Sequence, residues 1–159
     1  MYFGGTTIRA LDLLKEHELA IGRLYAAYAG RFPRDREFWM GLSREERQHA
    51  EWVESLRMRV DEDPSALAAD RFPTGAIELS LAYVRRLIES VDAPSLTRVN
   101  ALSIALDLER ALLEHKYFEV FKSGNPRVKR TLQLLRRSTE SHLQKVQHLW
   151  ESGTKSPAR

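Results

Sequence analysis

The chain has 159 residues, a net charge of +3 and no cysteine. This length suits one domain with a sizeable core, and 43% hydrophobic with 30% charged residues is typical of a folded helical protein rather than a disordered one. Without cysteine, the sequence excludes disulfides, zinc knuckles and thiolate-bound iron on this chain. The modest positive charge neither requires nor excludes an anionic partner.

The first two predicted helices form a pair. One begins near Thr6 or Thr7, either of which can act as N-cap, and continues to about Gly30; the next is capped by Asp35 and runs to about Asp61. Inward positions at helical spacing on these two helices are Leu11, Leu14, Glu18, Ile21, Tyr25, Tyr28, Leu42, Glu46, His49, Val53, Leu56 and Val60.

The second half of the chain predicts another pair, after a loop at 62–74 and a short helix at 76–91. The third long helix is capped by Ser95 and runs to about Ser123, and the fourth runs from Pro126 to near Gly153. Inward positions here are Leu102, Leu106, Glu109, Leu113, Lys116 or Tyr117, Val120, Val128, Leu132, Leu135, Thr139, His142, Val146 and Leu149.

Four long helices with short turns within each pair, and a connection of roughly 30 residues between the pairs, predict an all-α, ferritin-like four-helix bundle. The long crossover contains the short fifth helix. We expect a single domain over residues 1–159, with the bundle at about 6–153 and a frayed tail at 154–159.

Polar residues interrupt all four apolar seams near the helix centres. Glu46 and His49 are three residues apart, so they share one helix face and can converge on one point. An unpaired carboxylate costs several kcal/mol, roughly, to bury, so a metal, a proton or a partner residue must compensate for it. Oxygen and nitrogen donors of this kind suit iron, manganese or zinc. The predicted metal ligands are Glu18, Glu46, His49, Glu109 and His142.

This layout resembles the ferritin-like di-iron carboxylate proteins, rubrerythrin in particular. That family takes one Glu from each of two helices and a Glu-x-x-His from each of the other two. Here Glu18, Glu46-x-x-His49, Glu109 and His142 match, as do Glu18-x6-Tyr25 and the stretch ALSIALDLERALLEHKYFEVF. The resemblance covers roughly residues 8–152. It implies iron, as one or two ions, and reduction of peroxide or O₂ coupled to oxidation of ferrous iron.

The sequence departs from the family pattern in two respects. Thr139 stands where the pattern has a Glu, so a second metal would be held more weakly than the first. The chain also lacks the cysteine-ligated rubredoxin iron that feeds electrons to the site in rubrerythrin. If the site is redox-active, its electrons must therefore come from an external donor protein.

Two other interpretations stay open. The polar layer can be a hydrogen-bonded cluster without metal, in a non-catalytic ferritin-like module that dimerises or binds a partner. A mini-ferritin that stores iron or coats DNA is the third hypothesis. The basic fourth helix predicts a solvated face rather than a nucleic-acid site, because no aromatic residues interleave with its charges.

The remaining residues give weaker expectations. The sequence predicts Tyr25, Tyr28 and Tyr117 as core aromatics, with contact between Tyr25 and the metal site as the alternative, and it places His17, His115 and His148 in solvent. Trp39, Trp52 and Trp150 are candidates for self-association, and a homodimer is expected. No signal peptide and no apolar run of about 18 residues is present, which predicts a cytoplasmic protein without a membrane partner.

Overall fold

A computed structural model describes residues 3–69, 71–114 and 121–154 of the protein. Within these residues the chain is all-α, as predicted, and its only β-type pairing is an isolated bridge between Ala68 and Lys122. The helices are α1 (Phe3–Arg31), the 3₁₀ turn η1 (Pro33–Asp35), α2 (Arg36–Glu62), α3 (Thr74–Glu89), α4 (Arg98–Glu114) and α5 (Pro126–Thr154). None of these described helices is long and apolar enough to cross a membrane.

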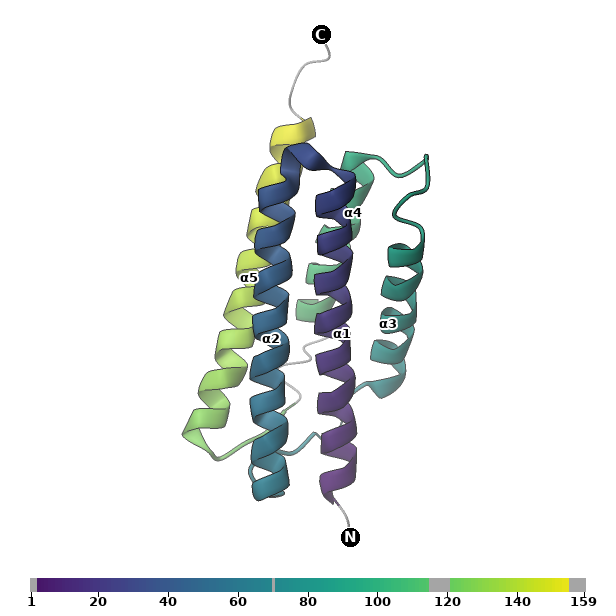
Figure 1. Ribbon diagram of the computed structural model, residues 1–159. Coiled ribbons are helices and arrows are strands. Elements are labelled where there is room, and N and C mark those ends of the chain that lie inside the picture. The colour runs from purple at the N-terminus through teal and green to yellow at the C-terminus, as the bar shows by residue number, and fades with distance from the viewer. Residues whose placement is uncertain (1–2, 70, 115–120, 155–159) are drawn as a thin grey trace.

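The long helices run lengthwise beside one another (Figure 1). Helices α1 and α2 form a hairpin through η1, α5 lies against both α2 and α4, and α3 covers the outer side of α1. The turn between α1 and α2 lies at the same end of the molecule as the end of α5, whereas α5 begins at the opposite end. This arrangement brings residues from α1, α2, α4 and α5 to a common interior.

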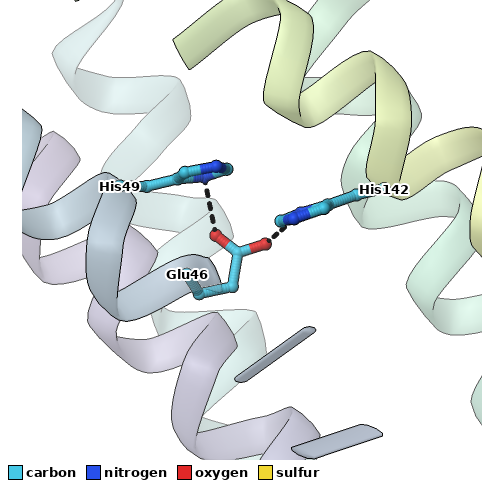
Figure 2. A group of neighbouring side chains, drawn as sticks. All are labelled: Glu46, His49 and His142. Atoms are coloured by element: carbon cyan, nitrogen blue, oxygen red, sulfur yellow. Dashed lines mark hydrogen bonds and ion pairs between the residues drawn. The ribbon is translucent and has the colours of Figure 1, made fainter. Parts of the chain in front are cut away.

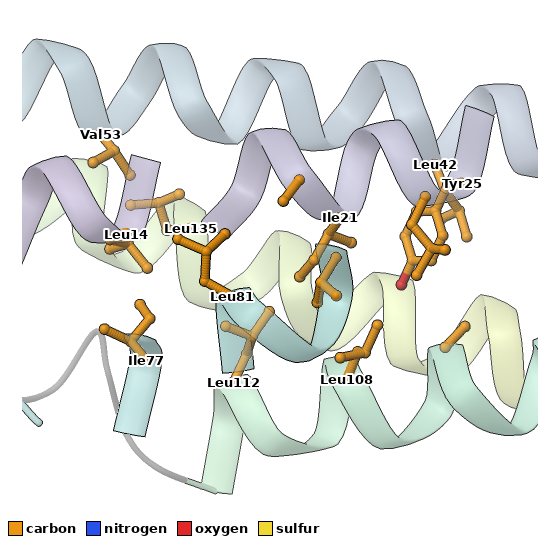
Figure 3. Close-up of a cluster of buried hydrophobic side chains, with 14 of the residues drawn as sticks. Leu14, Ile21, Tyr25, Leu42, Val53, Ile77, Leu81, Leu108, Leu112 and Leu135 are labelled. Carbon is orange, nitrogen blue, oxygen red and sulfur yellow. The ribbon is translucent and has the colours of Figure 1, made fainter. Parts of the chain in front are cut away.

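The interior is apolar above and below the predicted polar layer. Side chains such as Leu14, Ile21, Val53 and Leu135 project inward from three helices and are fully buried (Figure 3). Burial of this apolar surface stabilises the helices at roughly 25 cal/mol per Å². These apolar layers therefore stabilise the packing of the helices on both sides of the polar layer.

The predicted start of the first helix is wrong, and the predicted cap of the second helix does not make the expected hydrogen bond. Helix α1 begins at Phe3, so neither Thr6 nor Thr7 caps it. Asp35 occupies the N-cap position of α2, as predicted, but makes no side-chain capping hydrogen bond, because its carboxylate instead accepts two hydrogen bonds from Arg98 at the start of α4.

The start and end of α4 also differ from the prediction. Thr97, not Ser95, caps the helix: its hydroxyl accepts a hydrogen bond from the backbone N–H of Asn100, and the Asn100 side chain accepts one from the backbone N–H of Thr97. The predicted continuation to Ser123 is wrong at 121–123, where Lys122 pairs with Ala68 instead of forming helix. The predicted inward positions Lys116, Tyr117 and Val120 lie outside the described residues.

Candidate metal centre

Three buried side chains from α2 and α5 form the centre of the polar layer (Figure 2). Glu46 and His49 lie one helical turn apart on α2, and His142 faces them from α5. Each is at most 1% exposed, and one ligand atom from each lies within 4.8 Å of the others. The group can therefore hold a metal ion.

The Glu46 carboxylate lies between the two imidazoles. Its Oε1 is 2.8 Å from Nδ1 of His142, and its Oε2 is 3.1 Å from Nδ1 of His49. The two rings stack with their centroids 4.9 Å apart at an interplanar angle of 16°. Both histidines thus turn the same nitrogen, Nδ1, toward the same carboxylate.

The two other predicted carboxylates flank this group. Glu18 of α1 places Oε2 at 3.7 Å from Nδ1 of His49, and Glu109 of α4 places Oε1 at 3.6 Å from Nδ1 of His142. Both are 0% exposed. The structure therefore brings all five predicted residues to one depth of the interior, and their roles as individual ligands stay predictions.

Two residues that the sequence analysis missed hold the outer nitrogens of the histidines. Nε2 of His142 is 2.6 Å from a carboxylate oxygen of Glu45, which also pairs with Lys145 at 2.9 Å. Nε2 of His49 is 2.6 Å from the hydroxyl of Ser138. Such partners orient a ligating imidazole. The sequence signal for them is a hydrogen-bonding residue directly before position 46 or 139, where Glu45 and Ser138 stand.

Two further buried hydroxyls, those of Tyr25 and Thr139, lie at the level of the polar layer but bind different partners. The phenol of Tyr25 donates a 2.6 Å hydrogen bond to Oε1 of Glu109, which places Tyr25 beside the candidate site as well as in the core. Thr139 is buried at the predicted level, but its hydroxyl donates to the carbonyl oxygen of Leu135 in its own helix. Thr139 therefore offers nothing to the cluster.

The electrostatics of the cluster favour protonated histidines when no cation is bound. Burial alone would lower the pKa of both imidazoles, but Glu46 and Glu18 raise the pKa of His49 to about 10. Glu109 and Glu46 raise the pKa of His142 to about 11 against the same effect of burial. Burial, reinforced by the charge of Glu46, raises the pKa of Glu18 to about 7.

Glu46 itself responds in the opposite direction. Burial and the charge of Glu109 would raise its pKa, but the two histidines outweigh them and lower it. Glu46 is therefore the carboxylate that stays ionised beside two imidazolium groups. A divalent cation would replace those protons without changing the sign of the charge beside Glu46.

Unsatisfied polar atoms test whether a cation fits this cluster. Among residues 3–69, 71–114 and 121–154, the buried atoms without a hydrogen-bond partner include Glu18 Oε1, Glu18 Oε2, Glu46 Oε2, His49 Nδ1 and Glu109 Oε2. A buried polar atom left unpaired costs about 1–3 kcal/mol, and native proteins hold few of them. Glu46 Oε2 and His49 Nδ1 lie 3.1 Å apart as an ion pair, but Glu18 and Glu109 carry carboxylate oxygens without a hydrogen bond, and a cation coordinated by them would remove that penalty.

The prediction that His17 faces solvent is wrong. Its side chain is 1% exposed, and its Nε2 lies 2.8 Å from the Ser80 hydroxyl on α3. The prediction failed because α3 covers the side of α1 that its apolar periodicity assigns to solvent. His148 is exposed as predicted, and His115 lies outside the described residues.

Comparisons with protein-family models, with curated proteins and with solved structures gave no match to this chain.

Proposed function

We propose that this protein is a ferritin-like, rubrerythrin-like protein that binds iron, as one or two ions, in the buried cluster. The observation that carries the proposal is the Glu46 carboxylate, with one oxygen on Nδ1 of His49 and the other on Nδ1 of His142. Glu18 and Glu109 flank it with unsatisfied oxygens. Manganese or zinc would satisfy the same nitrogen and oxygen donors.

The finer description of the fold belongs to the same proposal. We infer a four-helix bundle of α1, α2, α4 and α5, with α3 in the long crossover between the pairs. Support comes from the order of the helices and from side-chain contacts that join α1 to α4, α2 to α5 and α1 to α2: Tyr25 with Glu109, His49 with Ser138, and Glu18 with His49. In such a bundle the ligands project inward from helix centres, where the apolar layers exclude water.

The chain's own residues prepare the site for this chemistry. Glu45 and Ser138 hold the outer nitrogens of the two histidines, so that both Nδ1 atoms face the carboxylates. Tyr25 orients Glu109 through its phenol. Bound ferrous iron would supply electrons for the reduction of peroxide or O₂.

Metal analysis of protein purified without chelators tests the proposal. We expect iron, zinc or manganese near stoichiometry, and an increase after anaerobic incubation with ferrous iron. His49→Ala should lose most of this metal while keeping its helical circular dichroism, and His148→Ala, which removes an exposed histidine, is the matched control. Metal below stoichiometry that ferrous iron does not raise would contradict the proposal.

A kinetic experiment tests the redox part separately. Because no cysteine-ligated iron is available to return electrons, peroxide should oxidise the bound ferrous iron once and then stop. Stopped-flow absorbance with excess peroxide measures this single turnover. Sustained turnover with reduced nicotinamide alone, without an added electron carrier, would contradict the requirement for an external donor.

The competing proposal is a non-catalytic helical module that dimerises or binds a partner. Two observations favour it: Thr139 supplies no ligand atom, and protonated His49 and His142 neutralise Glu46 without a metal. This alternative predicts a stable, metal-free protein whose melting temperature does not respond to ferrous iron or to chelator. A concentration-dependent dimer in analytical ultracentrifugation would support the module's role in association.

A further inference from the structure

An aromatic series extends from the candidate metal centre toward the turn between α1 and α2. It begins at Tyr25, whose phenol donates to Glu109. The ring of Tyr25 lies 5.5 Å from that of Trp39, measured between centroids, and the ring of Trp39 lies 5.0 Å from that of Tyr28. All three side chains are at most 1% exposed. Tyrosine and tryptophan are the aromatic side chains that lose a single electron most readily.

Packing alone does not explain the choice of residues in this series. The indole Nε1 of Trp39 and the hydroxyl of Tyr28 are buried and have no hydrogen-bond partner among the described residues. An unpaired buried donor costs about 1–3 kcal/mol, and at Tyr28 phenylalanine would fill similar space without that cost. The polar atoms of these two oxidisable rings therefore add nothing to the packing.

The far end of the series comes close to the surface. Phe38 contacts Trp39 at 5.1 Å between centroids, and Phe32 contacts Tyr28 at 6.1 Å. Both phenylalanines are half-buried, and the neighbouring residue Arg34 of η1 is exposed. A single layer of side chains thus separates the oxidisable rings from a molecule bound at this turn, which Figure 1 shows at one end of the hairpin.

We propose that Tyr25, Trp39 and Tyr28 form a one-electron relay between the Glu109 side of the cluster and the α1–α2 turn. The inference rests on the proposed function, which requires an external donor, and it makes the turn the end of the relay that receives electrons from that donor, a one-electron carrier. Hydrogen peroxide takes up two electrons and two protons to give two waters. The relay passes those electrons from the carrier one at a time.

The hydrogen bond from Tyr25 to Glu109 provides a path for the phenol proton each time Tyr25 loses or regains an electron. When Tyr25 gives up an electron, its phenol proton moves along the bond to Oε1 of Glu109, which leaves a neutral tyrosyl radical and a protonated carboxyl. When an electron returns through Trp39, the same proton moves back. Figure 3 shows Tyr25 projecting from α1 into the interior, so the radical would form away from solvent.

A metal-free experiment tests the relay in the full-length chain. Because the sequence has no cysteine, Arg34→Cys provides a single attachment point for a photo-oxidisable ruthenium complex beside the turn. With chelator present, a flash of light and a soluble quencher generate the ruthenium(III) oxidant, which removes one electron. We expect a tyrosyl radical in electron paramagnetic resonance spectra that disappears in Tyr25→Phe and falls by about an order of magnitude in Trp39→Phe.

Two controls complete the experiment. The label on Arg127→Cys, at the opposite end of the molecule, should give much less of the Tyr25 radical. Trp39→Phe keeps an aromatic ring but is smaller than the fully buried indole, so it should melt somewhat lower than the wild type, and helical circular dichroism must show that it is folded. Equal radical yields in wild type and folded Trp39→Phe, or a signal unchanged in Tyr25→Phe, would overturn the relay.

The outcome separates the relay from the proposed function because no metal takes part in the measurement. A protein that binds iron but forms no radical at Tyr25 loses the relay and keeps the proposed function. A protein that forms the radical but binds no metal supports electron transfer along the series and overturns iron binding.

Discussion

Helices α2 and α5 present the same three positions to the interior but fill two of them differently. Glu45, Glu46 and His49 on α2 correspond in spacing to Ser138, Thr139 and His142 on α5. The histidines are alike in burial and in orientation. Glu46, however, faces both histidines, whereas the Thr139 hydroxyl turns back to its own helix. Equal spacing therefore does not give equal half-sites, because only a carboxylate is long enough and charged enough to reach across.

The residues that bind the Nε2 atoms of the two histidines, here called the outer supports, each lie on the helix opposite their histidine. Glu45 of α2 holds the histidine of α5, and Ser138 of α5 holds the histidine of α2. One support is a charged, 41% exposed carboxylate that also pairs with Lys145, and the other is a neutral hydroxyl. The α5 histidine is thus held between two carboxylates of α2, which supplies two of the four carboxylates around the histidines, while α1 and α4 supply one each.

Replacement of the shared carboxylate should have the largest effect. Glu46→Ala leaves two buried imidazoles without their common partner, so the metal-free protein should lose about 3–5 kcal/mol of unfolding free energy. Its metal content should fall close to zero. Thr139→Ala on the corresponding position of α5 is the control and should keep its metal. Elemental analysis and urea denaturation measure both effects, and unchanged metal in Glu46→Ala would remove Glu46 from the site.

The second prediction concerns pH and the protonated histidines. The pKa values of His49, about 10, and His142, about 11, are raised above 6.5, so the folded protein binds more protons than the unfolded chain. Metal-free stability should therefore fall as the pH rises from about 6.5 to 11, by at most about 1.4 kcal/mol per pH unit for each histidine. Glu18, with its pKa raised to about 7, acts in the same direction between pH 4.5 and 7.

Denaturation with chelator at pH 7 and pH 9 measures this dependence, and NMR of labelled imidazoles assigns it. His142 should stay protonated to a higher pH than His49, because Glu109 and Glu46 raise its pKa to about 11, whereas the pKa of His49 is about 10. Metal binding at pH 7 should release protons from both rings. Stability that rises between pH 7 and 9 in chelator would contradict the assigned charge states.

Thr139→Glu should make the two half-sites alike and has a smaller, metal-dependent effect. The added carboxylate beside His142 completes a second Glu-x-x-His, so the second metal position should fill further. Tenfold tighter binding stabilises the native state by about 1.4 kcal/mol in excess iron. With chelator, another buried carboxylate should destabilise the fold by about 1–3 kcal/mol.

Melting temperatures of wild type and Thr139→Glu, each with iron and with chelator, separate these two effects. Equal destabilisation of the variant in both conditions would mean that position 139 does not face a metal.

The outer supports should give the smallest effects, and they should differ. Glu45→Gln keeps the shape of the side chain but removes the negative charge that faces Nε2 of His142. Metal affinity should therefore fall about tenfold, which is the low end of the loss for residues that orient a metal ligand, because Glu45 is partly exposed. Ser138→Ala removes a neutral partner and should cost less. Competition with a chromogenic chelator measures both affinities. A larger loss in Ser138→Ala would reverse the proposed order of the two supports.

The sequence predicted the helical class and the main helices because their apolar seams repeat at helical spacing over many residues. It also brought Glu46 and His49 to one face, since a separation of three residues on a helix is local geometry. The predicted helix ends were less successful. Asp35 and Ser95 both have the chemistry of a cap, but Asp35 pairs with Arg98, and Thr97 caps α4 with Asn100.

What the sequence determined by itself is the set of polar residues that the interior must accommodate: three glutamates and two histidines on seams that are otherwise apolar. Only the tertiary structure decided how they pair, because the decisive contacts join residues far apart in the chain. Glu45 and Ser138 lie off the predicted seams and became partners of His142 and His49 only when α2 and α5 packed together. In the same way, α3 buried His17 by covering a face of α1 that local periodicity assigns to solvent.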